Sequence, residues 1–183
     1  MIEAPRIAPG SRAEIGTVNA LLTVIAGRVA GTAEPPHLFT TLARHRRLFR
    51  RWLRFAGALM PRGTLPRRDT ELVILRVAAN CGSEYERRHH EPLARRAGVS
   101  ADEIARVAAG PDAPGWSDRD AVLLRAVDEL HAERRISDGV WQRLAAQRPA
   151  VELIELCLLA GHYEMLAMTI ASLGIQPDAR RRR

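Results

Sequence analysis

The sequence contains no lysine, so all 28 residues counted as lysine or arginine are arginines. Enzymes that form a Schiff base on a lysine and nucleotide-binding proteins with a P-loop lysine are therefore excluded. Cysteine is also scarce, because Cys81 and Cys157 are the only two and lie far apart. This spacing fits neither a secreted disulfide scaffold nor a zinc knuckle. We expect a reducing, cytoplasmic environment.

Long apolar runs are missing as well. No stretch approaches the ~20 uninterrupted apolar residues of a membrane span, and residues 1–6 lack the basic-then-apolar order of a signal peptide. We expect a soluble protein without a membrane partner. With 183 residues and 46% hydrophobic content, the chain is long enough for one domain with a core and too short for two.

The basic excess is concentrated at the end of the chain. The formal net charge is +7, but four arginines form the run 180–183, and the other 24 arginines against 21 acidic residues leave +3. A composition biased toward alanine and arginine accounts for this charge more simply than a polyanionic partner does. We expect no nucleic-acid partner, and we predict that residues 177–183 form a disordered basic tail.

Proline and glycine divide the chain into segments with helical periodicity, and no alternating strand pattern of convincing length competes. We predict an all-α fold, a single-domain helical bundle of about eight or nine helices with a central helical hairpin. Residues 1–33 are predicted to form an N-terminal arm or helix, and residues 34–176 the helical domain. Three helices are expected over residues 38–43, 48–59 and 83–97, and a further one between them is capped by Asp69 or Thr70. Three more open at Ser100, Ser117 and Ser137, and the last runs from Pro149 to Gly174.

Catalytic chemistry is concentrated between Glu71 and His90, where an apolar helix, a glycine turn and a polar-faced helix follow one another. On an ideal helix Ser83, Glu86 and His90 fall within a stripe roughly 60° wide. Glu86 and His90 are four residues apart, so their side chains can meet. A hairpin would bring Glu71 toward the same face. A carboxylate, an imidazole and a hydroxyl on one face are groups that acid–base catalysis uses.

This spacing resembles the carboxymuconolactone decarboxylase and alkylhydroperoxidase D superfamily. Glu71 is followed after twelve residues by a first site, after three more by a second and after four more by His90. The phrase Ala-Gly-Val-Ser-Ala-Asp-Glu-Ile then covers residues 97–104. The resemblance extends over most of residues 38–175. It implies an alkylhydroperoxidase D-like helical fold and self-association as a trimer or hexamer, with a dimer as the alternative.

The resemblance also shows which chemistry is absent. In the peroxidase branch the two sites seven and four residues before the histidine are the redox cysteines of Cys-x-x-Cys, whereas here they are Ser83 and Glu86. We therefore expect decarboxylase-like chemistry without a cofactor or metal. The resemblance implies that His90 transfers the proton, and that Glu86 and Glu71 set the tautomer and the pKa of His90. The substrate would be a small anionic molecule, an unsaturated carboxylic or lactone acid that is decarboxylated or isomerised.

Further residues are candidates for substrate binding. By the same analogy Ser83 or Tyr85 would donate a hydrogen bond to the substrate. The polar segment 162–164 interrupts an apolar helix, so His162 and Tyr163 either line the same pocket or form an ordinary buried hydrogen bond. Three arginines could bind a substrate carboxylate, and the sequence does not distinguish among Arg76, Arg87 and Arg88.

Several alternatives stay open at this stage. An alkylhydroperoxidase-like peroxide reductase could use Cys81 as its redox residue, although a structural thiol is the simpler interpretation. The chain could also be a non-catalytic, ligand-binding member. Residues 93–107 imitate a DNA-binding helix-turn-helix, but Asp102 and Glu103 would face phosphates there. A metal site on His89, His90, Glu86 and Glu71 is disfavoured, because adjacent histidines cannot both face one ion from a regular helix.

Overall fold

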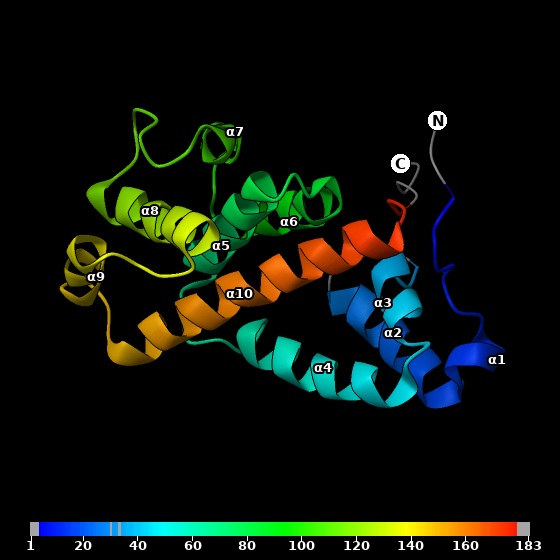
Figure 1. Cartoon of the computed structure of the whole chain (residues 1–183). Coiled ribbons are helices and arrows are strands. Elements are labelled where there is room, and N and C mark those ends of the chain that lie inside the picture. The colour runs from blue at the N-terminus through cyan, green and yellow to red at the C-terminus, as the bar shows by residue number, and fades with distance from the viewer. Residues whose placement is uncertain (1–3, 30, 33, 179–183) are drawn as a thin grey trace. The chain divides into compact units, whose positions relative to one another are not determined.

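The described part of the chain is entirely helical. The structure, a computed structural model, describes residues 4–29, 31–32 and 34–178, and these residues form ten helices and no strand (Figure 1). The all-α prediction is confirmed, with one or two helices more than expected. The helices are α1 (Arg12–Ile15), α2 (Thr17–Val29), α3 (His37–Leu42), α4 (Arg46–Leu59), α5 (Arg67–Asn80), α6 (Glu84–Arg96), α7 (Ala101–Ala109), α8 (Asp118–Glu133), α9 (Asp138–Ala145) and α10 (Ala150–Leu173).

Helix α5 is the centre of one of two compact units, which comprises residues 59–168. Its apolar side chains point in nearly every direction, and Leu72, Val73 and Ile74 are completely buried. Helices α6, α7 and α8 all pack against it. A helix that is apolar all round belongs inside a core, and each buried side chain of this kind contributes about 1.5–3 kcal/mol. Helix α5 is thus a rigid support for polar groups placed on it.

A tight turn folds α6 back along α5. Gly82 has a φ of +61°, a conformation that glycine adopts without a steric penalty. The N–H of Ser83 donates to the carbonyl of Ala78 at 2.8 Å and closes the turn. The predicted central hairpin is confirmed, and it places residues near the start of α5 beside residues in the middle of α6.

Three predicted helix starts are confirmed at serines. Ser100 and Glu103 form a reciprocal capping box at the start of α7. The hydroxyl of Ser117 accepts a hydrogen bond from the N–H of Asp120, and Ser137 directly precedes α9. The side chains of Ser100 and Ser117 satisfy backbone donors that the first turn of a helix leaves without partners, whereas the hydroxyl of Ser137 donates to Glu129 instead.

The predicted start of α5 is wrong by one turn. The helix begins at Arg67, directly after Pro66, instead of after Asp69 or Thr70. The carbonyl of Pro66 accepts the N–H of Thr70 at 3.0 Å, so the first turn is already helical there. Asp69 does not cap the helix, because its carboxylate accepts a hydrogen bond from the buried Arg148 at 2.8 Å.

The second unit comprises residues 1–58 and 169–183. The described part of the predicted N-terminal arm or helix forms α1 and α2. Ile15, Ala43 and Phe49 form a buried cluster in this unit, and the N–H of Arg6 donates to the carbonyl of Leu173 at 3.0 Å. Of the predicted basic tail, residues 179–183 lie outside the described residues.

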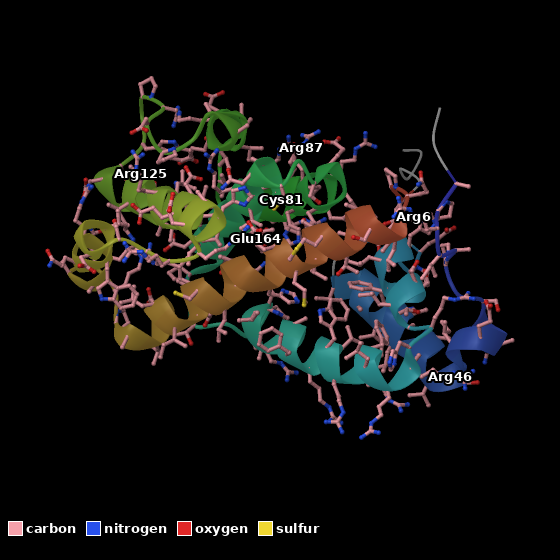
Figure 2. The ribbon with its side chains drawn as sticks, in the orientation of Figure 1. Arg6, Arg46, Cys81, Arg87, Arg125 and Glu164 are labelled. Carbon is pink, nitrogen blue, oxygen red and sulfur yellow. The ribbon has the colours of Figure 1, made fainter. Side chains whose placement is uncertain are left out.

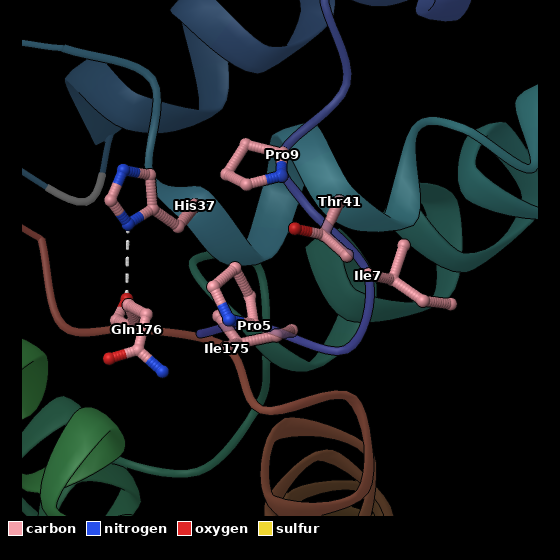
Figure 3. A pocket seen from close by; sticks show the side chains of 7 residues that line it. All are labelled: Pro5, Ile7, Pro9, His37, Thr41, Ile175 and Gln176. Atoms are coloured by element: carbon pink, nitrogen blue, oxygen red, sulfur yellow. Dashed lines mark hydrogen bonds between the residues drawn. The ribbon is translucent and has the colours of Figure 1, made fainter. Parts of the chain in front are cut away.

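A small pocket of about 180 Å³ lies within this second unit (Figure 3). Its wall is almost entirely apolar, and one of its members, His37, is fixed by a 3.1 Å hydrogen bond between Nδ1 and the carbonyl of Gln176. Pockets that enclose small-molecule ligands are usually larger, about 300 Å³ or more. The pocket is lined by Pro5, Ile7, Pro9, His37, Thr41, Ile175 and Gln176.

By length and composition alone, α10 could cross a membrane. However, 56% of its most apolar 18-residue window is buried inside the protein. Buried core helices of globular proteins have the same composition.

Candidate active site

Glu71 and His90 form a buried acid–base pair. Glu71 lies on α5 with no solvent exposure, and His90 lies on the face of α6 that packs against it. His90 Nδ1 is 2.8 Å from Glu71 Oε2. The other carboxylate oxygen accepts a hydrogen bond from Arg67 Nη2 at 2.6 Å. Both oxygens of a buried carboxylate are therefore satisfied, as burial of a charge requires.

Tyr163 of α10 continues this chain of hydrogen bonds. Its hydroxyl is 3.2 Å from His90 Nε2 and 3.6 Å from Met60 Sδ, and the two rings are edge-to-face with centroids 5.1 Å apart. Burial raises the pKa of Tyr163 well above its usual range, so the phenol keeps its proton. With the Nδ1 proton directed at the Glu71 carboxylate, Nε2 is the ring atom that contacts the tyrosine hydroxyl. The tautomer of His90 follows from its two partners.

Glu86 is buried on α6 without a hydrogen-bond partner for either carboxyl oxygen among the described residues. Burial raises its pKa to about 7, the nearby Glu164 carboxylate adds to the rise, and Ser83 and His89 oppose it. The buried hydroxyl of Ser83 lies close enough to Glu86 to lower the pKa of its carboxyl, but the two groups do not meet the geometry of a hydrogen bond. Unsatisfied buried polar atoms are rare in proteins and are frequently found where a ligand binds. Near neutral pH, Glu86 is therefore a carboxylic acid that can give up its proton.

Glu86 and His90, whose spacing would let their side chains meet, form no hydrogen bond with each other. Both side chains are buried on α6, as their spacing of four residues predicted. No hydrogen bond joins them, because His90 Nδ1 bonds to Glu71 and Nε2 to Tyr163. Glu71 and Tyr163 therefore orient the imidazole, and the carboxyl group of Glu86 takes no part in this.

Of the other predicted binding residues, His162 packs against Tyr163, whereas Tyr85 packs against His89. His162 is buried, with its ring edge-to-face with Tyr163 at 5.2 Å, and burial together with the nearby His90 lowers its pKa to about 4. It is a neutral imidazole at physiological pH. The ring of Tyr85 instead stacks on His89 at a centroid distance of 4.4 Å.

The three arginines proposed as carboxylate ligands pair with acidic residues of the protein. Arg76 donates to Asp128 and to the carbonyl of Val107. Arg87 and Arg88 both donate to Glu84 on the exposed face of α6, where Figure 2 labels Arg87. The arginine at the acid–base pair is Arg67, which the sequence analysis missed. Its spacing of four residues before Glu71 was the available signal.

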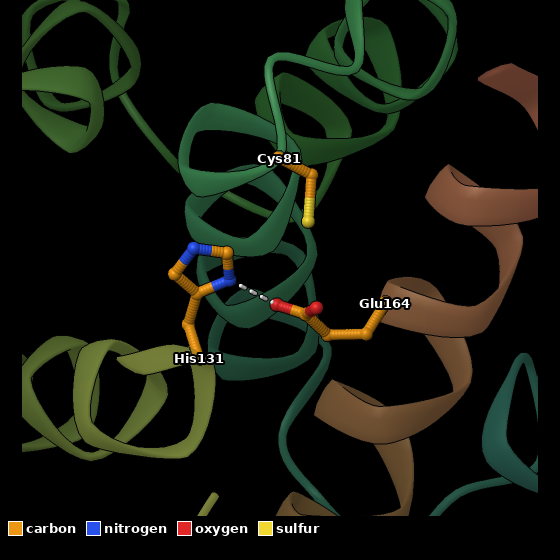
Figure 4. Close-up of side chains that lie close together, drawn as sticks. All are labelled: Cys81, His131 and Glu164. Atoms are coloured by element: carbon orange, nitrogen blue, oxygen red, sulfur yellow. Dashed lines mark hydrogen bonds and ion pairs between the residues drawn. The ribbon is translucent and has the colours of Figure 1, made fainter. Parts of the chain in front are cut away.

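Cys81 directly follows α5 and lies near His131 of α8 and Glu164 of α10 (Figure 4). Burial and the Glu164 carboxylate raise the pKa of its thiol to about 12. A thiol with this pKa stays protonated at neutral pH and is a weak nucleophile. The cluster of these three side chains was not predicted from the sequence.

Comparisons with known proteins bear on the family and the fold. The model of the carboxymuconolactone decarboxylase family matches residues 46–129, which include α5, α6 and α7. Over this part of the chain, which holds the Glu71–His90 hairpin, the sequence is similar to the carboxymuconolactone decarboxylase family. No curated protein sequence matches it.

Solved structures share the superfamily fold over nearly the whole chain. An alkylhydroperoxidase AhpD core protein from Ralstonia eutropha JMP134, an uncharacterized peroxidase-related protein, superimposes with a TM-score of 0.82 at 16% identity, covering 96% of this chain and 93% of that one. A peroxidase-related protein from Silicibacter sp. TM1040 gives 0.81 at 12% identity, with coverages of 98% and 96%. The debrominase Bmp8 has the same fold, with a TM-score of 0.79 at 13% identity. The match covers 94% of this chain and 92% of that one. A cysteine-to-alanine variant of Bmp8 is in complex with 2,3,4-tribromopyrrole.

Proposed function

We propose that this protein is an enzyme that carries out cofactor-free acid–base chemistry, a decarboxylation or an isomerisation, on a small unsaturated carboxylic or lactone acid. The observation that supports this most strongly is the Glu71–His90–Tyr163 chain of hydrogen bonds next to a Glu86 that has no described partner. Two titratable groups in different environments can act as acid and base in one site.

Each side chain has a distinct role in this scheme. Glu71 fixes the tautomer of His90, so that Nε2 is the atom that takes up or returns a proton. Glu86, with a pKa near 7, supplies a proton to the carbon that receives negative charge. The hydroxyls of Ser83 and Tyr163 hydrogen-bond to the substrate. The Arg67 side chain, 41% exposed beside Glu71, offers a positive charge to an anionic substrate.

Decarboxylation in this site balances without a cofactor. The bond between the substrate carbon and its carboxylate breaks, CO2 leaves, and the electron pair is delocalised into the conjugated lactone carbonyl. A proton from Glu86 then forms the new C–H bond. In an isomerisation, His90 removes a proton next to the carbonyl and Glu86 returns one at the conjugated carbon. Exclusion of water by the buried surroundings favours both reactions.

The thiol chemistry supports this choice over a peroxide reductase. Ser83 and Glu86 occupy the positions of the redox cysteines in the peroxidase branch. Cys81, with its raised pKa, is protonated at neutral pH, and thiolates, not thiols, attack peroxides. A peroxide cycle would also need a resolving thiol.

The test is proton exchange at a substrate carbon. The protein is incubated in D₂O with carboxymuconolactone and a panel of unsaturated lactone acids, and NMR follows deuterium incorporation and loss of the carboxylate. We expect turnover that falls at least about 100-fold in His90→Gln, since a positioned acid–base group contributes about 10²–10⁴-fold. His45→Gln, at an exposed histidine outside the candidate site, is the matched control and keeps its activity.

Two results would argue against the proposal. One is an absence of exchange with every substrate of the panel. The other is turnover of an organic hydroperoxide that disappears in Cys81→Ser but persists in His90→Gln, which would assign the thiol as the reactive group.

A further inference from the structure

Three side chains from three helices converge at the end of α5. Cys81 comes from the turn after α5, His131 from the last turn of α8 and Glu164 from the middle of α10. One potential ligand atom from each residue lies within 4.8 Å of the other two. Figure 4 shows the sulfur and the imidazole both directed toward the Glu164 carboxylate. His131 Nδ1 is 2.5 Å from Glu164 Oε1.

We propose that Cys81, His131 and Glu164 bind a divalent transition-metal ion, with Zn²⁺ as the preferred metal. Thiolate, imidazole and carboxylate are the three ligand types that zinc takes in proteins. When the ion binds, the S–H bond of Cys81 breaks, its proton passes to the solvent and the sulfur bonds to the metal. A hard cation such as Mg²⁺ or Ca²⁺ would not select a sulfur ligand. With three protein ligands, the fourth tetrahedral position stays open to water or to another small ligand.

The separations need little adjustment to close around an ion. Zinc–nitrogen and zinc–oxygen bonds of about 2.0–2.1 Å and a zinc–sulfur bond of about 2.3 Å place tetrahedral ligand atoms about 3.3–3.6 Å apart. The sulfur therefore has to approach by at most about 1.3 Å, while the 2.5 Å contact between His131 and Glu164 opens. Side-chain rotation accomplishes both movements, because these residues are only partly buried.

The charges around the cluster include one cation that opposes metal binding. Glu164 is the acidic ligand, and the carboxyl of Glu86 also acts electrostatically on Cys81. Against them, Arg134 Nη1 is 3.6 Å from Glu164 Oε2. The Arg134 side chain is 71% exposed, so it can turn into the solvent when an ion takes its place.

The three ligands differ from the acid–base residues, although Glu86 is coupled electrostatically to both Cys81 and Glu164. Tyr163 contacts His90, whereas its neighbour Glu164 contacts His131. None of Glu71, His90 and Tyr163 supplies a ligand here. Metal binding can therefore be tested independently of the proposed reaction.

The experiment is a titration of the metal-free, untagged protein with ZnCl₂ by calorimetry, and with Co²⁺ by absorption spectroscopy. We expect about one ion per chain, intense visible bands of tetrahedral Co²⁺ and a near-ultraviolet band from thiolate to cobalt. Cys81→Ser abolishes the ultraviolet band, and Cys81→Ser and His131→Gln each weaken zinc binding by at least about tenfold. Arg134→Gln strengthens it by about threefold, because a positive charge is removed.

Two control variants locate the ion. Cys157→Ser removes the other cysteine, and His90→Gln removes the histidine of the acid–base pair; both keep wild-type zinc affinity. Zinc binding that is unchanged in Cys81→Ser, or that is lost in either control, overturns the proposal. Should Cys81→Ser fail to fold, alkylation of the wild-type protein replaces it. Zinc then protects Cys81 but not Cys157, and equal labelling of Cys81 with and without zinc overturns the proposal.

Discussion

Glu71 has no solvent exposure, and its Oε2 atom lies 2.8 Å from Nδ1 of His90. The same carboxylate accepts a hydrogen bond from Arg67 at 2.6 Å. One buried acid thus neutralises an arginine at the surface and orients an imidazole in the interior. The stability of the protein and the geometry of the candidate site depend on the same side chain.

Removing the Glu71 carboxylate should destabilise the protein. Glu71→Ala leaves a buried imidazole N–H without its acceptor, and we expect the free energy of unfolding to fall by about 3 kcal/mol. Glu71→Gln keeps one acceptor oxygen and should cost less, about 1–2 kcal/mol. Urea denaturation measures both. The control is Glu84→Gln on the exposed face of α6, expected within about 1 kcal/mol of wild type. Equal losses for Glu71→Ala and Glu84→Gln would refute this account.

The raised pKa of Glu86 should make stability decrease as the pH rises. The carboxyl titrates near 4.5 in the unfolded chain and near 7 in the folded protein. Between these values the folded protein binds more protons, so its free energy of unfolding falls with pH, by about 3 kcal/mol once the window is passed. Glu86→Gln removes this dependence. Relative to wild type, the variant should therefore gain stability from about pH 4.5 to about pH 7, and the gain should then level off. A stability difference that does not change with pH would show that the carboxyl ionises normally.

The Cys81 thiol should react slowly with alkylating reagents. Burial first, and the Glu164 carboxylate second, raise its pKa to about 12. At about pH 8 its rate with iodoacetamide should be at least about tenfold below that of an unperturbed thiol of pKa about 8.5. Glu164→Gln should accelerate the labelling of Cys81. The pKa of Cys157 is raised by burial alone, so its rate should not change, and an equal acceleration at both cysteines would rule out the electrostatic cause.

Gly63 should not tolerate a side chain, whereas Gly57 should. A Cβ at Gly63 would lie 2.1 Å from Glu155 Oε1 and 2.5 Å from the carbonyl oxygen of Leu59. Glu155 accepts the N–H groups of the following loop residues, so Gly63→Ala should lower the melting temperature, with a cost of about 1–3 kcal/mol. Gly57 lies inside α4 with nothing within 4 Å of its Cβ position. Gly57→Ala should add about 0.5–1 kcal/mol. A neutral Gly63→Ala would show that the loop can move.

The acid–base pair could be predicted because its members belong to one hairpin. Helical periodicity, the glycine turn and the spacing between Glu71 and His90 are local properties of the sequence. The role of Tyr163 remained one of two alternatives, because the order of helices in space decides which residue of α10 meets His90. The start of α5 was misplaced, since Asp69 is a good capping residue that here pairs with Arg148.

The cluster of Cys81, His131 and Glu164 had no signal in the sequence. Its members are separated by about 50 and about 33 residues, and no periodicity or motif of the kind that marks metal-binding cysteines connects them. Only the packing of α8 and α10 against the end of α5 brings them together. The ion pairs of the arginines could not be predicted from the sequence either. The arginines proposed as substrate ligands pair with acidic residues of the protein, as Arg76 does with Asp128 and Arg87 with Glu84.

The hairpin also bears on the order in which the chain folds. Glu71 and His90 are 19 residues apart, whereas His90 and Tyr163 are 73 apart. Closing the shorter loop costs about 1 kcal/mol less in chain entropy, and contacts between near neighbours in sequence tend to form early. The carboxylate can thus acquire both of its partners while α10 is still unstructured, which protects the nascent core from an unpaired charge. Tyr163 then docks onto an imidazole whose orientation is already set.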